Sequence, residues 1–278
     1  MGILSIQSQV ASGHVGNSAA VFPLRRFGHE VWPVPTVLFS NHPGHGSCHG
    51  PVLATADVGD LLDGLDERGC LEACDAVLLG YMGRLETARR ALEACRRVRS
   101  TNADAVICCD PVMGDQPEGL YVDDGFVEFY AREASPIADV MFPNAFELET
   151  LTGMPVADVA SAAAAARRLT AMGPAIVVAT SVPADMGSLV NILAADEAVW
   201  AIETPRIPAA AKGAGDFLSA LWLGRYLNGR DATAAFAAAV ASTYDLVERS
   251  RGRADLSIVA TQDNWMSPAR CFQPVRFM

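Results

Sequence analysis

The turn Gly213-Ala214-Gly215-Asp216 comes directly before an apolar helical stretch that begins at Phe217. Two glycines let the backbone turn tightly and present free N–H groups at the helix start, where the helix dipole favours an anion. The same dipole is expected to hold Asp216 ionised. A carboxylate base beside an anion pocket suits a hydroxyl group that attacks a phosphoryl group. The alternative interpretation is an ordinary helix start, with a capping Asp beside flexible glycines.

Further polar residues follow the apolar strands that the sequence predicts. Because ligands of open α/β sheets bind beyond the carboxyl ends of the strands, these residues are candidates for one shared site. They are Gln7-Ser8, Tyr81, Asp110-Pro111 with Asp115, Pro143-Asn144 with Glu147, and Thr180-Ser181. Asp110 suits a hydrated Mg²⁺ site, whereas Glu147 could equally be a first-turn helix acid. The chain has neither a Walker-type phosphate loop nor a Gly-x-Gly-x-x-Gly motif, which excludes the commoner nucleotide-binding motifs.

Short apolar strands alternate with longer helical stretches along the whole chain. Strands are predicted at residues 3–6, 31–34, 76–79, 105–109, 140–142 and 175–179, and helices near Asn17 and over 57–68 and 86–99. Apolar strands separated by helices are typical of a parallel sheet that is covered on both faces. Pro33 indicates an edge strand or an early strand end.

The last third of the chain has a different pattern. Residues 189–193 and 198–204 are expected to form an antiparallel pair, and two long helices, one from Gly215 and one over 231–247, close the chain. No internal repeat or linker interrupts the pattern. We therefore predict an α/β fold, with a mainly parallel central sheet and helices on both faces, in a single domain that spans residues 1–278.

Composition excludes several classes of protein. Of 278 residues 51% are apolar, which excludes intrinsic disorder, and a net charge of −11 argues against nucleic-acid and membrane-surface partners. No apolar run approaches the roughly 18 residues of a membrane span, and the N-terminus lacks the basic region of a signal peptide. The 7 cysteines are scattered and odd in number. Reduced thiols in a cytoplasmic protein are the expected interpretation.

The motifs together resemble the ribokinase-like superfamily and, within it, the pyridoxal kinases of vitamin B6 salvage. The segments that carry the resemblance are Ser5–Ser8, Gly13–Ala20, Phe39–His42, Gly80-Tyr81, Asp110–Gly114, Pro143-Asn144 with Glu147, and Gly213–Asp216. They cover nearly the full length. Hydroxymethylpyrimidine kinases share the late Gly-x-Gly-Asp motif, but the segments around Ser8 and Asn41-His42 favour the pyridoxal kinases.

The resemblance implies ATP-dependent phosphorylation of the 5′-hydroxymethyl group of pyridoxal, with Asp216 as the base and Gly213, Ala214 and Gly215 as the anion hole. Around the substrate it places Ser8, Val15, Phe39, His42, Tyr81 and Asp216. On the ATP side it places Asp110, Asp115, Tyr121, Asn144, Glu147, Thr180, Ser181, Lys212, Gly213 and Gly215, with Asp110 and Glu147 towards Mg²⁺. Asp115 and Tyr121 would belong to a lid. The resemblance also implies a homodimer, and whether a monovalent cation is needed stays open.

One departure from the family concerns the loop after Asn41-His42, where Pro43-Gly44 replaces the usual Thr. A hydroxyl that could contact the substrate is lost, and proline has no N–H to replace it. Two alternatives therefore stay open: a B6-vitamer carrier with weak turnover, and a hydroxymethylpyrimidine kinase. The nearby His45, Cys48 and His49 match no common zinc spacing, so we expect a polar substrate or dimer loop there.

Lys212 is the only lysine of the chain and directly precedes Gly213. Three interpretations are open for it. Lys212 could act electrostatically on a phosphate, form a Schiff base with an aldehyde, or lie in solvent as a loop cation.

Overall fold

The computed structural model describes residues 1–185, 187–208 and 211–277. Within them, one sheet has the strand order β11-β10-β9-β8-β7-β4-β3-β1-β2. Its strands are β1 (Gly2–Val10), β2 (Glu30–Phe39), β3 (Cys74–Leu79), β4 (Val106–Cys109), β7 (Val140–Met141), β8 (Ile176–Pro183), β9 (Ser188–Ala195), β10 (Ala198–Pro205) and β11 (Val275–Arg276). The neighbours from β2 to β8 are parallel, and those from β8 to β11 are antiparallel. The predicted mainly parallel α/β fold is confirmed.

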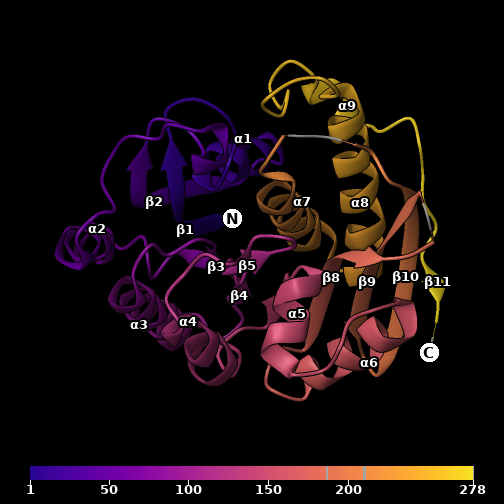
Figure 1. Cartoon of the computed structure of the whole chain (residues 1–278). Coiled ribbons are helices and arrows are strands. Elements are labelled where there is room, and N and C mark those ends of the chain that lie inside the picture. Colours follow the sequence, from indigo (N-terminus) through magenta and orange to yellow (C-terminus); the bar gives the residue numbers. More distant parts are fainter. Residues whose placement is uncertain (186, 209–210, 278) are drawn as a thin grey trace.

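Helices cover both faces of the sheet, as predicted. They are α1 (Asn17–Arg26), α2 (Thr55–Glu67), α3 (Leu85–Thr101), α4 (Gly125–Phe129), α5 (Ala145–Thr152), α6 (Val159–Thr170), α7 (Ala214–Gly229), α8 (Ala232–Arg249) and α9 (Gln262–Met266). Figure 1 shows α2 to α6 on one side of the sheet and α1, α7, α8 and α9 on the other. No described helix is long and apolar enough to cross a membrane.

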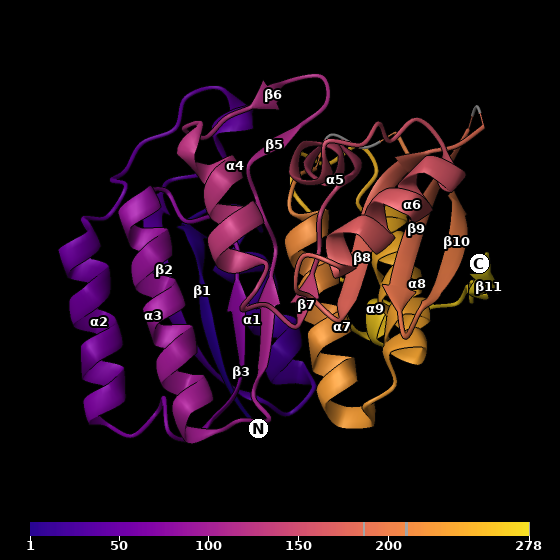
Figure 2. The same ribbon diagram turned by 90° about the horizontal axis from the view of Figure 1, so that it is seen from below.

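A short hairpin leaves the sheet at one end of the molecule. It consists of β5 (Gly114–Asp115) and β6 (Gly119–Leu120), which pair antiparallel. Figure 2 shows this hairpin at the end opposite to the N-terminus, from which β1 starts. The hairpin therefore lies at the edge where the parallel strands have their carboxyl ends, and there we expected the functional residues.

The structure decides two predictions about elements. Pro33 indicated an edge strand or an early strand end, and the edge strand is confirmed, because β2 runs on through Pro33 and Pro35 to Phe39. It lies at the edge of the sheet, where one side of the backbone has no neighbouring strand and proline is tolerated. The chain also does not close with two long helices, since α9 and β11 follow α8.

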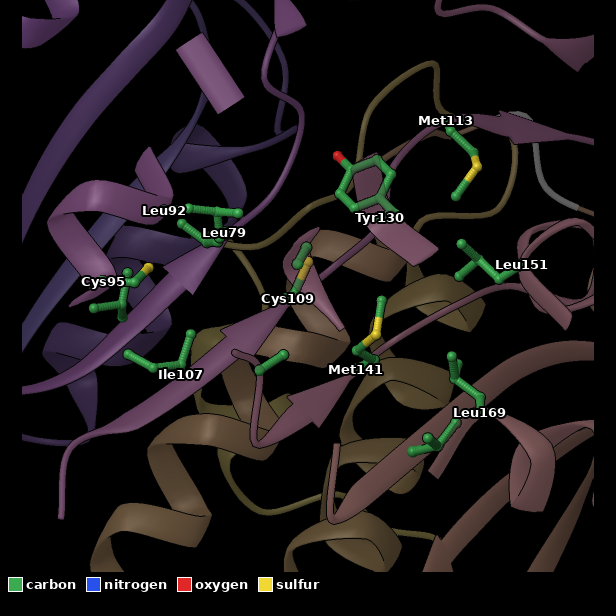
Figure 3. Close-up of a cluster of buried hydrophobic side chains, with 14 of the residues drawn as sticks. Leu79, Leu92, Cys95, Ile107, Cys109, Met113, Tyr130, Met141, Leu151 and Leu169 are labelled. Atoms are coloured by element: carbon green, nitrogen blue, oxygen red, sulfur yellow. The ribbon is translucent and has the colours of Figure 1, made fainter. Parts of the chain in front are cut away.

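The sheet separates two apolar cores. Figure 3 shows the one under α2 to α6, in which Ile107 and Met141 from the strands lie with Cys95 from α3. Burial raises the pKa of Cys95 to about 12, which makes this thiol chemically inert. The opposite core centres on Trp222 of α7, which is fully buried and stacks on Tyr226 with 4.6 Å between ring centroids. All seven cysteines are free thiols.

Candidate active site

Helix α7 begins in a turn that only glycine can make. Gly213 has a φ of 96°, and a Cβ atom on it would lie 1.9 Å from the carbonyl oxygen of His14. The start of α7 is therefore packed directly against the loop that follows β1. The first amides of a helix have no intrahelical partner, so this turn presents free N–H groups beside Asp216, as the motif predicts.

Asp216 lies in the first turn of α7, with part of its surface accessible and protein atoms packed closely around it. Desolvation raises the pKa of its carboxyl to about 6, and a hydrogen bond from the backbone amide of Gly16 opposes this shift. Loss of water is therefore the larger of the two influences on this pKa. A carboxyl with this pKa is still mainly ionised at pH 7 and can take up a proton near neutrality.

Asp110 follows β4 and is buried beside the glycine turn. One of its carboxylate oxygens, Oδ2, lies 4.0 Å from the position that a Cβ atom on Gly215 would take. Burial, and then the negative charges of Glu147 and Asp216, raise the pKa of Asp110 well above its usual value. Among the described residues no group donates a hydrogen bond to this carboxylate, an environment that suits a bound cation.

Glu147 has a definite structural role at the start of α5. Its Oε2 accepts the amide of Asn144 at 2.9 Å and its Oε1 accepts the amide of Met113 at 3.0 Å. Oδ1 of Asn144 in turn accepts the Glu147 amide at 2.9 Å, which completes a capping box. Burial still outweighs these bonds and raises the pKa of Glu147 to about 8.

Asn144 also links this helix start to its neighbours. Its Nδ2 donates to the carbonyl of Gly114 in the β5–β6 hairpin at 2.8 Å. Its backbone forms a bridge with Thr180, whose amide donates to the carbonyl of Pro143 at 2.9 Å. One N–H of the Asn144 side chain and its Oδ1 are thus occupied by protein groups, so a direct contact with a phosphate would need the second N–H of Nδ2.

Thr180 and Ser181 lie where β8 departs from regular pairing. The register between β8 and β9 shifts between Ala179 and Val182, and Ser181 has a φ of 57°. A bulge of this kind re-aims side chains at a strand end. It takes both residues out of the regular β8–β9 pairing, and the backbone of Thr180 lies beside Asn144 at the start of α5.

The β5–β6 hairpin stands beside the acidic residues. Tyr121, the residue after β6, is 51% exposed. The pKa of its hydroxyl is raised by partial burial and by the negative charges of Glu147, Asp110 and Asp216. These three carboxylates come from three separate segments of the chain. Asp115 lies in the same hairpin and is exposed.

The residues predicted to surround a substrate come from three loops. Ser8 at the end of β1 and Val15 in the next loop are 9% and 8% exposed. Phe39 ends β2 and is half-buried, as is Tyr81, whose carbonyl accepts the Thr36 hydroxyl at 2.6 Å. The shared edge of the sheet brings these residues to the same end of the molecule as Asp216.

His42 has its ring orientation determined by the unusual Pro43-Gly44 sequence. Its Nδ1 accepts the amide of Gly44 at 3.0 Å, at the start of a 3-10 turn (Pro43–His45). The neutral ring therefore carries its proton on Nε2 and can donate from that atom. Burial, and then the charges of Lys212 and His45, lower the pKa of His42, which favours this neutral form.

Sequence reasoning missed Asp255, which joins the loops on this side. Its carboxylate lies 3.3 Å from Nε2 of His45, and Oδ1 would be 2.5 Å from a Cβ atom on Gly13. Its backbone forms a bridge with Lys212, whose side chain is exposed. No local pattern could have indicated Asp255, because it lies in a polar loop after the last long helix.

Two shallow cavities flank the site. The first has a volume of about 500 Å³ and is lined by His14 and residues 253–257, 259 and 260. The second has a volume of about 290 Å³ and is lined by Val52, residues 83–86, Asp123 and Gly125. Neither is lined by Asp216 or Asp110. Within the described residues no group of three or more His, Cys, Asp and Glu side chains is arranged to hold a metal ion. A magnesium site at Asp110 would thus depend on phosphate oxygens and water for its other ligands.

Comparison with known proteins identifies relatives over the whole chain. The phosphomethylpyrimidine kinase family model matches residues 72–255. Pyridoxal kinase PdxY of Rubrobacter xylanophilus is 46% identical, with 100% of this chain and 96% of the relative covered. Pyridoxal kinase PdxY of Corynebacterium diphtheriae is 42% identical, with 98% of each covered. The structure of pyridoxal kinase from Leishmania donovani in complex with ADP and pyridoxine superposes with a TM-score of 0.94 at 29% sequence identity. The superposition covers 100% of this chain and 99% of that one.

Proposed function

The chain belongs to the pyridoxal kinase family, and we propose that it transfers a phosphoryl group from ATP to the 5′-hydroxymethyl group of pyridoxal, forming pyridoxal 5′-phosphate. The observation that carries this proposal is the environment of Asp216. A carboxyl with a pKa of about 6 lies at the free amides of α7 and beside the buried Asp110. A B6-vitamer carrier would have no need of a base at an anion pocket.

In the proposed reaction the substrate oxygen forms a bond to the γ-phosphorus while the bond from that phosphorus to the β–γ bridging oxygen breaks. ADP leaves with the bridging oxygen, and Asp216 accepts the hydroxyl proton. The amides at Gly213–Gly215 donate hydrogen bonds to the transferred group, where negative charge develops. Ser8, Val15, Phe39, His42 and Tyr81 orient the pyridine ring.

The nucleotide side is proposed to contain the remaining polar residues of this edge. When bound with ATP, Mg²⁺ supplies positive charge that neutralises the phosphates. Asp110 would hold it directly, because this carboxylate has no donor of its own. Glu147 would act through water, since two backbone amides already occupy its oxygens. The other groups along the phosphates would be Asn144, Thr180, Ser181 and Lys212, with Asp115 and Tyr121 in a lid.

Three further properties belong to the same proposal. Residues 1–278 act as one kinase domain, the enzyme is a homodimer, and it works in the cytoplasm. The seven free thiols support a reducing compartment. Size-exclusion chromatography with light scattering tests the dimer, and a monomer at working concentration would contradict it.

One observation favours a second substrate class. The matching family model describes phosphomethylpyrimidine kinases, and Pro43-Gly44 replaces the Thr that is common among pyridoxal kinases. Release of ADP should therefore be measured with pyridoxal, pyridoxine and hydroxymethylpyrimidine as competing acceptors. We expect the highest kcat/KM with a B6 vitamer.

The same assay needs two variants. Asp216→Asn should slow ADP release by about 10²–10⁴-fold, whereas Asp57→Asn, which removes an exposed first-turn acid of α2, should leave it unchanged. A faster reaction with hydroxymethylpyrimidine would assign the second substrate class. Tight binding of pyridoxal without any ADP release would identify a carrier and refute the kinase proposal.

A further inference from the structure

Strand β1 has a break in its pairing with β2 close to its carboxyl end. The two strands pair in parallel register as far as Gln7 and again from Gln9, but the register shifts between these two residues. Ser8 therefore lies opposite two residues of β2, Thr36 and Val37, in place of one. A break of this kind bends the strand and leaves backbone groups outside the ladder, so other groups must bond to them and hold the segment in place.

The first residue of α1 bonds to the strands on one side of this break. Nδ2 of Asn17 donates to the carbonyls of Gln7 in β1 and Val34 in β2, both at 3.3 Å. Its Oδ1 accepts the hydroxyl of Ser5 at 2.7 Å, and that hydroxyl accepts Nε2 of Gln7 at 2.9 Å. Because Asn17 is only 2% exposed, water cannot replace these bonds. Both polar atoms of its side chain thus fix the chain directly before Ser8.

The second residue of α1 bonds to β1 on the other side of the break. The hydroxyl of Ser18 donates to the carbonyl of Val10 at 2.8 Å and accepts Nε2 of Gln9 at 2.7 Å. Two consecutive residues of one helix therefore hold β1 before and after Ser8. The residue that precedes them packs on Ser8 itself, since a Cβ atom on Gly16 would lie 2.2 Å from Oγ of Ser8.

The hydroxyl of Ser8 differs from the polar groups around it. Within the part of the chain that the structure describes, it forms no hydrogen bond, whereas the side chains of Ser5, Asn17 and Ser18 all do. Ser8 is 9% exposed, so its surroundings are packed but do not seal it from the site. A hydroxyl that is held on both sides and has no partner of its own is available to a ligand.

We propose that Asn17 and Ser18 are positioning residues for the acceptor substrate: they hold the break in β1 in the geometry that presents the Ser8 hydroxyl to the pyridine ring. This inference rests on the proposed place of Ser8 at the substrate. Asn17 and Ser18 bond to β1 and β2, so they act on the substrate through Ser8. Their removal should weaken recognition of the acceptor and leave the nucleotide side intact.

The first test compares Asn17→Ala with Asn102→Ala in the full-length enzyme. Asn102 is a matched control, because its Nδ2 also donates to a strand carbonyl, that of Cys74 at 3.1 Å, but at the start of β3 and so at the opposite end of the sheet. A hydrogen bond changes a binding constant by about five- to tenfold, so kcat/KM for pyridoxal should fall by this factor in Asn17→Ala.

The KM for ATP should stay close to that of the wild type in both variants, and Asn102→Ala should keep its kcat/KM for pyridoxal. General damage would instead raise both KM values of Asn17→Ala together. An unchanged kcat/KM for pyridoxal in Asn17→Ala, or an equal fall in Asn102→Ala, would overturn the proposal.

The second test asks whether the effect of Asn17 passes through Ser8. In a Ser8→Ala background, replacement of Asn17 by Ala should change kcat/KM for pyridoxal by less than about twofold, because the contact that Asn17 positions is already absent. A fall of the same size with and without the Ser8 hydroxyl would show that Asn17 has only a structural role, and the proposal would be wrong.

Ser18→Ala and a binding measurement complete the test. Ser18 is half-buried, so its replacement is the milder change, and it decides the matter if Asn17→Ala does not fold. A Ser18→Ala enzyme with kcat/KM for pyridoxal within about twofold of the wild type would then contradict the proposal. The dissociation constant for pyridoxine, measured by equilibrium dialysis without ATP, should rise in these variants and in Ser8→Ala. If it rises but the wild type releases no ADP with any acceptor, only the proposed function fails.

Discussion

The raised pKa of Asp216 predicts how the reaction depends on pH. Only the ionised carboxylate can accept the substrate proton, so activity should be present above the pKa and lost as the pH falls through it. With a pKa of about 6, roughly nine-tenths of the enzyme is ionised at pH 7 and about one-tenth at pH 5. The value of kcat/KM should therefore fall about tenfold between these two pH values. An unperturbed Asp, with a pKa of 3.8, would leave it almost unchanged over this range.

The measurement is kcat/KM for pyridoxal from pH 4.5 to 8 at saturating ATP and Mg²⁺, because this ratio reports the ionisation of the enzyme to which pyridoxal has yet to bind. Pyridoxal itself ionises in this range, so its own titration is measured from its absorbance and the kcat/KM profile is corrected for it. Asp216→Asn should lower kcat by about 10²–10⁴-fold, and its residual activity should lack the acid limb. An acid limb centred near pH 4, or one that persists in Asp216→Asn, would show that another group controls the reaction.

Three further predictions concern the residues around Asp216. Asp110→Ala and Glu147→Ala should each raise the Mg²⁺ concentration that gives the half-maximal rate. Glu147→Ala should also lower the free energy of unfolding by about 1 kcal/mol, because α5 loses its cap. Unchanged Mg²⁺ titrations in both variants would show that the two residues have purely structural roles. Pyridoxal phosphate followed by borohydride reduction should label Lys212, and ATP should block this labelling. Labelling of the N-terminal amine alone would place Lys212 away from the site. Asp255→Asn breaks the pair with His45 and should raise the KM for pyridoxal with little change in the KM for ATP. Equal increases in both KM values would indicate that the variant disturbs the whole site.

The sequence by itself determined the architecture and the helix start that contains Asp216. Apolar strands that alternate with helices predict a parallel sheet, because only burial of both faces permits strands with so few polar residues. The Gly213–Asp216 motif predicts a helix start with an acid in its first turn, because glycine geometry and helix capping act over a few neighbouring residues. Both predictions depend on residue patterns within short segments, which the sequence contains in full.

Only the tertiary structure decided the pKa values of the site residues and the groups that they contact. The pKa of Asp216 is raised by desolvation, which depends on how distant segments pack around it, and the Gly16 amide that opposes this shift is 200 positions away in the chain. Glu147 contacts both its own helix start and Met113, and this double role depends on where the loop after β4 passes. Asp255 reaches His45 because the segment after α8 returns across the site. Burial and contacts between distant segments arise only when the chain has folded, and no local pattern contains them.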